Sequence, residues 1–541
     1  MLAACGGGDD PAAPAPSAPE PLAPSAPTDE PLEPAEWITA AAGVPTTLDY
    51  WTTYQGDPTR HQMYEMMSTL VEYDANDFEG QGCSQLASAA DMRPGLAESW
   101  EYNADRTELI YTLRQGVLSP LGNELTAEDV KWSFDRAREQ SSVVRFLVFQ
   151  NGNFREEDPF EARDRYTFVV HLDQAGSLDA ALMTWGQFTV LDTTEVRKHA
   201  TDEDPWANEW LITNHVNFGP WALERFDPGN EVVWVPNENY WNAENRGNIV
   251  RYTIRNVDEA ATRLQLVQTG DVDYAERLSF EDYSNLIATG GAQVANCLSH
   301  QRDTLVLNTT NALFSDPKVR RAVSLAIDRE ALVEGVYRGI ATPTTNGLAE
   351  AYWTPGADAP RVQFDADQAR ALLAEAGYPN GFDMEIVSSP SRPGAHAEAL
   401  AIQIQAMLAE VGINVTVTNI PVASEFSDRF FAGQYDAILY LEPPAIGDPF
   451  YSLNLYNTTG GFQNTHQYSN AQYDELTEFI LRTPDGPERD AAMAEVSGII
   501  VEDVPMIYLV ERNLAFAFSQ AAGNYVHKPH GQIQAWEMIK R

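Results

Sequence analysis

The sequence predicts an α/β fold with a partly parallel sheet. Short runs of β-branched and aromatic residues, each bounded by Asp, Gly or Pro, alternate with segments in which apolar residues recur at helical spacing. Strands that alternate with helices are joined by crossovers, which place neighbouring strands parallel. With 541 residues, the chain is long enough for roughly three to four domain-sized units.

The first half contains the clearest strand patterns. Residues 108–114, 166–172 and 231–235 are predicted strands because they are short, rich in β-branched and aromatic side chains, and bounded by turn residues. Thr126-Ala-Glu-Asp129 matches a capping box and predicts a helix that begins at this point.

The second half is more regular. Asp316 and Pro317 predict a helix start, and the apolar spacing after them predicts a helix that continues to Gly339. Further predicted elements are helices over 365–377 and 396–411 and strands over 414–418 and 436–440.

The charge balance limits the possible partners. The chain has 35 Lys and Arg against 79 Asp and Glu, a formal net charge of −44. Nucleic acid is excluded as a main partner, because phosphate binding requires basic surface. Two explanations stay open for the acidity: a solvated surface that keeps the protein soluble, or steering of a cationic ligand. No uninterrupted apolar run approaches the length of a transmembrane helix.

The N-terminal residues indicate a lipid anchor. Leu2-Ala-Ala-Cys5-Gly6 resembles a bacterial lipoprotein box, in which the Cys is lipidated. The residues up to 36 are almost entirely Ala, Pro, Ser, Gly and acidic residues, a composition too poor in apolar surface to fold. We therefore expect residues 1–36 to be a tether behind a lipidated Cys5, with the start of the signal peptide upstream of the printed sequence.

Two further cysteines, Cys83 and Cys297, lie far apart in the sequence. An exported protein reaches a compartment that permits disulfides. The sequence leaves two alternatives open, a disulfide between them or two isolated thiols.

Motifs for catalysis are missing from the sequence. It contains no phosphate-binding Gly-rich loop with Lys, no His-Glu-x-x-His, no Gly-x-Ser-x-Gly and no Cys-x-x-Cys. The closest histidine pair, His527 and His530, lies in a Pro-containing tail and lacks the further ligands that a metal site requires. The sequence therefore predicts a binding protein that is not an enzyme and has no cofactor or metal.

A set of ordered blocks resembles family 5 of the bacterial extracellular solute-binding proteins, the receptors of dipeptide, oligopeptide and nickel ABC importers. They appear in the family's order, and the resemblance extends from about Trp37 to Arg541. The blocks are residues 93–100, 125–130, 218–221, 228–229, 239–241, 269–273, 308, 314–322, 326–330, 371–378, 412–413, 447–449 and 502–505.

The resemblance implies two lobes that close on a solute in the cleft between them. Lobe I would comprise residues 37–300 and 505–541, and lobe II residues 301–504. It also implies a monomeric receptor, periplasmic or otherwise extracytoplasmic and lipid-anchored to the membrane, that delivers a short peptide or related solute to the permease and ATPase subunits of an ABC importer.

The resemblance also places candidate ligand contacts. In peptide-binding members an Asp holds the α-amino group of the ligand, and Ala445 occupies that place here. A buried ammonium requires a carboxylate partner, and Glu442 is the nearest substitute. The positions that match the lining of the family's cleft are Tyr54, Gln55, Arg429, Tyr440, Glu442, Asp448 and Tyr508.

Alternatives stay open at this point. Asp448 could instead cap the next helix. Aromatic residues in a cleft stack on sugar rings as readily as on peptide side chains, so an oligosaccharide is the alternative solute. An alternative of another class is a secreted hydrolase or a sensor subunit that uses the same fold.

Overall fold

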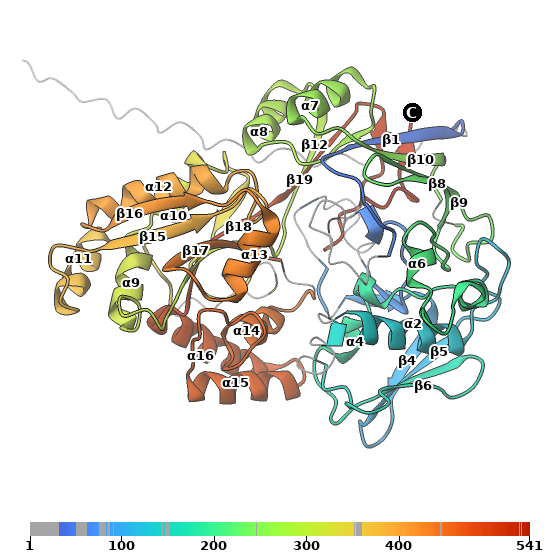
Figure 1. Cartoon of the computed structure of the whole chain (residues 1–541), viewed down its shortest axis with the longest axis horizontal. Helices are drawn as coiled ribbons and strands as arrows, with labels where there is room; N and C mark the ends of the chain where they lie inside the picture. Colours follow the sequence, from blue (N-terminus) through green and yellow to red (C-terminus); the bar gives the residue numbers. More distant parts are fainter. Residues whose placement is uncertain are drawn as a thin grey trace, which may run out of the picture.

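The computed structural model has two lobes, each built around its own mixed sheet (Figure 1). This arrangement confirms the predicted α/β class and the two-lobed architecture. The structure describes residues 32–49, 62–74, 83, 87–89, 91–141, 144–145, 152–244, 246–350, 352, 360–443, 446–529, 531 and 533–541.

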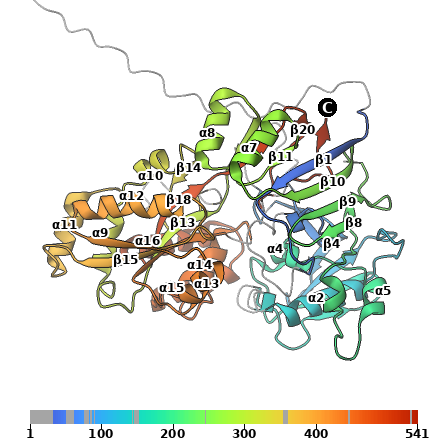
Figure 2. The same cartoon turned by 45° about the horizontal axis from the view of Figure 1, so that its top comes forward.

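Lobe I is organised around a seven-stranded sheet. Its strands in spatial order are β12 (Gln293–Cys297), β19 (Leu514–Phe518), β11 (Tyr274–Ala275), β1 (Ala35–Ala41), β10 (Ile249–Asn256), β9 (Glu231–Pro236) and β8 (Trp221–Asp227). β1 pairs in parallel with β10 and β11, and the other pairs are antiparallel. Helices α7 (Ala260–Thr269) and α8 (Phe280–Thr289) cover one face of this sheet, as Figure 2 shows.

A smaller sheet and several short elements complete lobe I. The four-stranded sheet runs β4 (Ala97–Tyr102), β5 (Glu108–Leu113), β7 (Thr167–His171), β6 (Phe160–Ala162), and α2 (Ala127–Gln140) packs on it. Two strand pairs are β2 (Val71–Tyr73) with β3 (Met92–Pro94) and β20 (Ala522–Gly523) with β21 (Ile539–Lys540). The short helices are α4 (Asp179–Leu182), η3 (Gly186–Phe188), α5 (Thr193–Val196), η4 (Arg197–His199) and α6 (Asn208–Leu211).

Lobe II has a six-stranded sheet with helices on both faces. Its strands in order are β14 (Ala341–Pro343), β18 (Met506–Arg512), β13 (Arg302–Leu307), β17 (Ala437–Glu442), β15 (Asp383–Ser388) and β16 (Asn414–Asn419). One face packs on α9 (Pro317–Leu325), α10 (Arg329–Gly335), α11 (Ala366–Glu375) and α12 (Ala397–Glu410). The other faces α13 (Ala423–Phe431), α14 (Pro449–Asn457), α15 (Ala471–Arg482) and α16 (Pro487–Asp503). Neighbouring strand residues point to opposite faces, so Arg302 and Asp303 belong to different cores.

Two crossing segments connect the lobes. The chain leaves lobe I after β12 and enters lobe II at β13, and it returns between β18 and β19. The segments are hydrogen-bonded to each other, because Ser299 Oγ donates to the Arg512 carbonyl at 2.7 Å and the Arg512 N–H donates to the Gln301 carbonyl at 3.0 Å. The return to the lobe I sheet therefore falls at Asn513, several residues after the expected boundary at 505.

Most elements follow the sequence patterns, with one difference in lobe II. The Asp129 carboxylate accepts hydrogen bonds from the N–H and hydroxyl of Thr126, as the capping box predicts. The single helix predicted from Asp316 to Gly339 is wrong, since α9 ends at Leu325 and α10 begins at Arg329. Asp328 caps a new helix through the Ala331 N–H. The apolar spacing continues across this break, because both helices pack on the same core.

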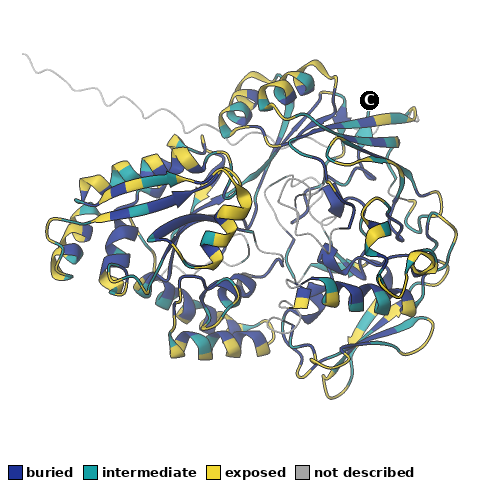
Figure 3. Cartoon of the chain, viewed as in Figure 1, coloured by how far each residue is buried: buried dark blue, intermediate teal, exposed yellow. Residues whose placement is uncertain are grey.

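Burial follows the layers of the two lobes, with buried strands inside and exposed positions on the outer helix faces (Figure 3). Trp37, Trp221 and Trp234 are at most 1% exposed in the lobe I core. No helix within the described ranges has both the length and the apolar composition needed to cross a bilayer.

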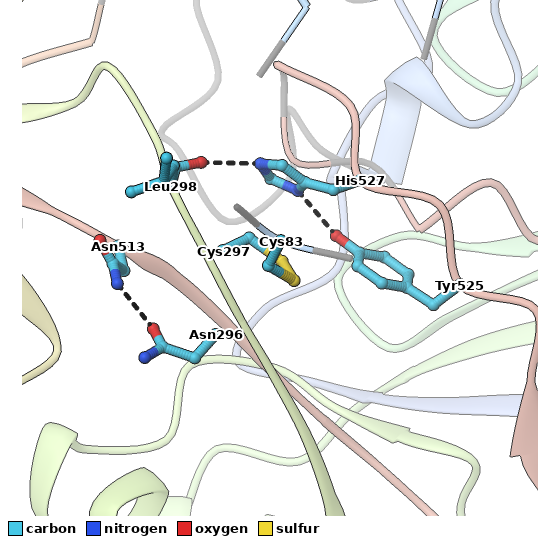
Figure 4. Close-up of a disulfide and its surroundings, with 7 residues drawn as sticks. All are labelled: Cys83, Asn296, Cys297, Leu298, Asn513, Tyr525 and His527. Atoms are coloured by element: carbon cyan, nitrogen blue, oxygen red, sulfur yellow. Dashed lines mark hydrogen bonds between the residues drawn. A yellow bond between two sulfur atoms is a disulfide. The ribbon is translucent and has the colours of Figure 1, made fainter. Parts of the chain in front are cut away.

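Cys83 and Cys297 form a disulfide, which resolves the alternative that the sequence left open (Figure 4). It joins the loop after β2 to the last residue of β12, immediately before the first crossing segment. The next residue, Leu298, donates its N–H to the Cys83 carbonyl at 2.9 Å, and its own carbonyl lies 2.8 Å from Nε2 of His527. The disulfide therefore fixes the lobe I end of the crossing segment.

Candidate functional site

A cavity of about 540 Å³ lies between the two lobes, beside the crossing segments. On the lobe I side it is lined by residues just after β1 and β11 and by the start of α8. On the lobe II side it is lined by the end of α10 and the start of α12. Ligands of open α/β sheets bind at the carboxyl ends of parallel strands, and this cavity has the volume of a small-molecule site.

The lobe I wall of the cavity carries a buried carboxylate. Glu276 follows β11 directly and is 7% exposed. Nε2 of Gln62 lies 3.3 and 3.2 Å from its two carboxylate oxygens and donates to the Gly43 carbonyl at 2.8 Å. Burial raises the pKa of Glu276 to about 7, although the charges of Arg277 and Arg263 and the hydrogen bond from Gln62 each lower it.

A second buried carboxylate on this wall holds the C-terminal segment. Glu65 accepts hydrogen bonds from the backbone N–H groups of Ile533, Gln534 and Ala535. Burial raises the pKa of Glu65 to about 7, although these three hydrogen bonds lower it. The lobe I wall thus carries two buried carboxylates, Glu65 and Glu276, beside Arg263 and Arg277.

The lobe II wall and the crossing segment carry basic side chains. Arg512 donates to Oε1 of Gln301 at 2.7 Å and to the Pro393 carbonyl at 2.9 Å. His396 Nε2 lies 2.5 Å from Oδ2 of Asp303, which also accepts from the Tyr337 hydroxyl at 2.6 Å. Burial alone would raise the pKa of Asp303, but His396, Arg512 and the Tyr337 hydroxyl together lower it. These groups are all held in place by protein partners.

Three of the predicted ligand residues lie together on one face of the lobe II sheet. Tyr440 and Glu442 belong to β17 and Tyr508 to β18, on either side of Arg302 in β13. Glu442 is fully buried, and Nη2 of Arg302 lies 2.8 and 2.7 Å from its two oxygens. The Arg302 guanidinium also lies 4.1 Å from the centre of the Tyr508 ring. Glu442 is therefore already paired with a cation of the protein.

Tyr440 packs between two side chains of its own lobe. Its ring stacks on Phe430 with centroids 4.0 Å apart, and the Arg392 guanidinium lies 4.2 Å from the ring centre. Its hydroxyl donates to Oε1 of Gln463 at 3.0 Å. Pro393, the residue after Arg392, lines the cavity, whereas Tyr440 and Arg392 are not among its lining residues.

The other predicted residues are not part of this cluster. Arg429, on α13, forms an ion pair with Glu385 and donates to the Gln434 carbonyl at 2.7 Å. Asp448 caps α14 by accepting from the Phe450 N–H at 2.8 Å, and it pairs with Arg489 at 3.0 Å. The capping alternative for Asp448 is therefore seen in the structure. Tyr54, Gln55, Ala445 and Cys5 lie outside the described residues.

The lobes also touch directly on the side of α14 and α15. The Gly447 N–H donates to the Tyr73 hydroxyl at 2.8 Å, and its carbonyl accepts from the Ala89 N–H at 2.9 Å. The Ser177 N–H donates to the Leu481 carbonyl at 2.8 Å. Gly447 fits closely here, since an added Cβ would lie 3.0 Å from the Tyr352 hydroxyl.

Potential metal ligands gather away from the cavity. Glu108, Glu161 and His171 bring ligand atoms within 4.8 Å of one another on the four-stranded sheet. Arg163 already pairs with both carboxylates, at 2.9 and 3.1 Å. His527, one of the predicted histidine pair, bonds to Tyr525 and to the Leu298 carbonyl, and His530 lies outside the described residues.

Sequence patterns did not indicate several residues that line the cavity, among them Gln62, Glu65, Glu276, His396 and Arg512. A signal for one of them was present. Glu276 follows the Thr269–Asp273 block by three residues, at the end of a strand that pairs in parallel. A charged residue in this position is expected at a ligand site of an α/β sheet.

Known proteins resemble this chain in sequence and in fold. A probable D,D-dipeptide-binding periplasmic protein of Escherichia coli (strain K12) is 25% identical over 91% of each chain. Heme-binding protein A of Haemophilus influenzae is 27% identical over 82% of this chain and 83% of that protein. The crystal structure of a dipeptide binding protein from Pseudoalteromonas sp. SM9913 in complex with Met-Leu superposes with a TM-score of 0.78 at 21% identity, covering 94% of this chain and 100% of that one.

The match to a family profile covers more than half of the chain. Residues 91–464 match the profile of the bacterial extracellular solute-binding proteins, family 5 middle region. This range includes the first cavity wall at Glu276, both sides of the first crossing segment and most of lobe II. The chain therefore belongs to family 5 of the bacterial extracellular solute-binding proteins.

Proposed function

We propose that this protein is the extracytoplasmic receptor of an ABC importer and that it binds a short peptide or a related solute between its lobes. The observation that carries the proposal is the cavity beside the two crossing segments, with walls from both lobes. Contacts that a solute makes to both walls exist only when the lobes are together, so binding favours the closed arrangement. The closed form is what the permease and ATPase subunits would recognise.

The names of the relatives support a peptide but differ among themselves. One is named for a D,D-dipeptide, one for heme, and one was solved with Met-Leu. The buried carboxylates of the lobe I wall, Glu65 and Glu276, favour a solute that carries a positive group, which a neutral oligosaccharide lacks. We therefore rank a peptide above the oligosaccharide alternative.

The residues predicted to contact the solute stay proposals. Tyr54 and Gln55 would contribute from lobe I. From lobe II the candidates are Arg429, Tyr440, Glu442, Asp448 and Tyr508. Because Glu442 is paired with Arg302, its carboxylate could bind a solute ammonium only while it also interacts with the Arg302 guanidinium.

We also propose a monomer tethered to the membrane through lipid on Cys5, with residues 1–36 as the spacer. The periplasmic name of the E. coli relative supports an extracytoplasmic location. Replacement of Cys5 by Ser in a gene that carries its signal peptide should release the protein from membranes and leave solute affinity unchanged. Retention in the membrane fraction would contradict the anchor.

The first experiment is a thermal-shift screen of the full chain against peptides, oligosaccharides, amines and metal ions. A ligand that binds only the folded protein raises the melting temperature, by mass action. Isothermal titration calorimetry would then give the affinity, and product analysis would detect turnover. Stabilisation by peptides without turnover supports the receptor. Stabilisation by sugars alone, or hydrolysis of the solute, would sink the peptide proposal.

A further inference from the structure

Glu276 is a buried anion without an ionic partner. Its side chain lines the cavity, and no Lys, Arg or His nitrogen of the described residues lies within ion-pair distance of its carboxylate. Two arginines, Arg277 and Arg263, line the same wall, and neither forms an ion pair with this carboxylate. Arg263 donates through Nε, Nη1 and Nη2 to backbone carbonyls, those of residues 276, 257, 258 and 277. A buried carboxylate without a counter-charge is costly unless a ligand supplies one.

Gln62 adds a second unsatisfied acceptor at the same place. It is 3% exposed and lines the cavity beside Glu276. Its Nε2 donates to Glu276 and to the Gly43 carbonyl, which fixes the orientation of the amide. Its Oε1 is buried and has no hydrogen-bond partner among the described residues. Both groups can only accept from a ligand, so an anion is disfavoured here and a group with several N–H donors is favoured.

The surrounding wall is aromatic. Tyr252, Tyr274, Phe280 and Phe516 line the same cavity. The faces of aromatic rings attract cations, most strongly in a desolvated site. On the opposite wall Arg512 and His396 are already bonded to protein groups. Of the two buried carboxylates on the lobe I wall, Glu65 accepts three backbone N–H groups, whereas Glu276 lies beside the unsatisfied Gln62 acceptor.

We propose that Glu276 and Gln62 form a cation subsite that holds the ammonium or guanidinium group of the solute against lobe I. The inference rests on the proposed function, because it names the solute class that the receptor takes. It moves the anchor of the positive group from lobe II, where Arg302 neutralises Glu442, to the carboxyl end of β11.

The test uses the full chain at pH 8 and matched probes with and without a positive charge. n-Butylammonium and n-butanol, followed by ligand-detected NMR, form a pair that does not depend on peptide recognition. Three peptides are then compared by calorimetry. Ala-Ala-Ala carries its cation at the N-terminus, N-acetyl-Ala-Lys-Ala carries it on a side chain, and N-acetyl-Ala-Ala-Ala has none. The variant is Glu276→Gln, and the control is Glu203→Gln at an exposed loop position.

We expect Glu276→Gln to weaken binding of each cationic probe about 10- to 100-fold, the range for a lost hydrogen bond to charge, and to leave the neutral probes within about twofold. Glu203→Gln should change neither. Gln62→Leu, which removes the second acceptor, should weaken the same cationic probes by a smaller factor. Because it leaves the carboxylate in place, it tests the subsite even if Glu276→Gln fails to fold.

The outcomes separate this subsite from the receptor function. Equal losses for charged and neutral probes, or no loss, overturn the subsite. If N-acetyl-Ala-Ala-Ala binds equally to wild type and variant and the amine shows no Glu276-dependent binding, the peptide receptor stands and the subsite falls. If butylammonium binds through Glu276 but no peptide binds, the subsite stands and the peptide receptor falls. Absence of all binding overturns both.

Discussion

Nη2 of Arg302 lies 2.7 Å from Oε2 of Glu442, and both side chains are fully buried in lobe II. The pair connects β13 to its neighbour β17, and the guanidinium also donates to the Gly347 carbonyl at 2.8 Å. A carboxylate that looks like a free ligand anchor in the sequence is thus part of the interior of its own lobe.

Removal of one partner should destabilise the protein. Arg302→Met leaves the Glu442 carboxylate buried and unpaired, and we expect the free energy of unfolding to fall by about 3 to 5 kcal/mol in urea denaturation. The double variant Arg302→Met with Glu442→Leu should recover most of this loss, because it removes both charges. A double variant as unstable as the single one would contradict the pairing.

Glu442→Gln separates binding from stability. If Glu442 receives a solute ammonium, the substitution should weaken solute binding by about 1.5 to 3 kcal/mol in calorimetry. If its main role is the pair with Arg302, stability falls and affinity is kept. Comparison with Glu276→Gln under the same conditions shows which carboxylate carries the cation.

The disulfide should contribute substantially to stability. Cys83→Ser combined with Cys297→Ser should lower the free energy of unfolding by about 2 to 5 kcal/mol, because the crosslink constrains the unfolded chain across a separation of 214 residues. Thermal melts of wild type with and without reductant give a second measurement of the same effect. A melting temperature that is equal in all three samples would show that the bond adds nothing.

Glu276 should make stability depend on pH between about 4.5 and 7. Its pKa is about 7 in the folded protein and 4.5 when exposed, so the folded state binds the proton more tightly. Stability from this group is therefore present below pH 4.5 and is lost as the pH rises toward 7. As the pH rises from 4.5 to 8, the free energy of unfolding of Glu276→Gln should increase relative to that of wild type by up to about 3 kcal/mol.

The control for this dependence is Glu203→Gln, whose difference from wild type should be flat with pH. Arg263, Arg277, Tyr274, Tyr283 and Gln62 all face or influence the Glu276 carboxylate, so they are left intact. A stability difference for Glu276→Gln that does not change with pH would contradict the raised pKa.

His215 should make the free energy of unfolding fall as the pH decreases, which is opposite to the effect of Glu276. Burial lowers its pKa to about 4, and its ring packs edge-on to Trp234 at 5.7 Å. The unfolded chain takes up the proton near pH 6.5 and the folded protein does not, so stability falls as the pH drops from 6.5 toward 4. His215→Phe should remove up to about 3 kcal/mol of this fall in acid denaturation curves.

Tyr73→Phe tests the contact between the lobes. It removes the hydroxyl that accepts the Gly447 N–H, so closing the lobes should become less favourable by about 0.5 to 1.5 kcal/mol and solute affinity should fall about 2- to 10-fold. Tyr166→Phe is the matched control, because within the described residues its hydroxyl bonds only to Glu124 and Arg165 of lobe I. Equal affinities for both variants would mean that this contact does not accompany binding.

Local patterns predicted the secondary structure well, because caps and turns depend on neighbouring residues. Asp365, for example, caps α11 through the Gln368 N–H as its position suggests. The cavity was harder to predict, because it joins residues that only the tertiary fold brings together. Gln62 and Glu276 are 214 positions apart, and the Arg302 partner of Glu442 lies on another strand. The sequence around an acidic residue does not show whether a cation from another strand pairs with its carboxylate.

The position of β19 sets the order in which the chain can finish folding during synthesis. β19 lies between β12 and β11, so the lobe I sheet stays divided until the residues after Asn513 have been made. The Glu65 carboxylate likewise gains its three backbone hydrogen bonds only after residues 533–535 have been made. Lobe II is made of contiguous residues from β13 to β18, so all its strands are synthesised before β19. The lobe whose synthesis begins first is therefore completed last, against the usual order of domains emerging from the ribosome.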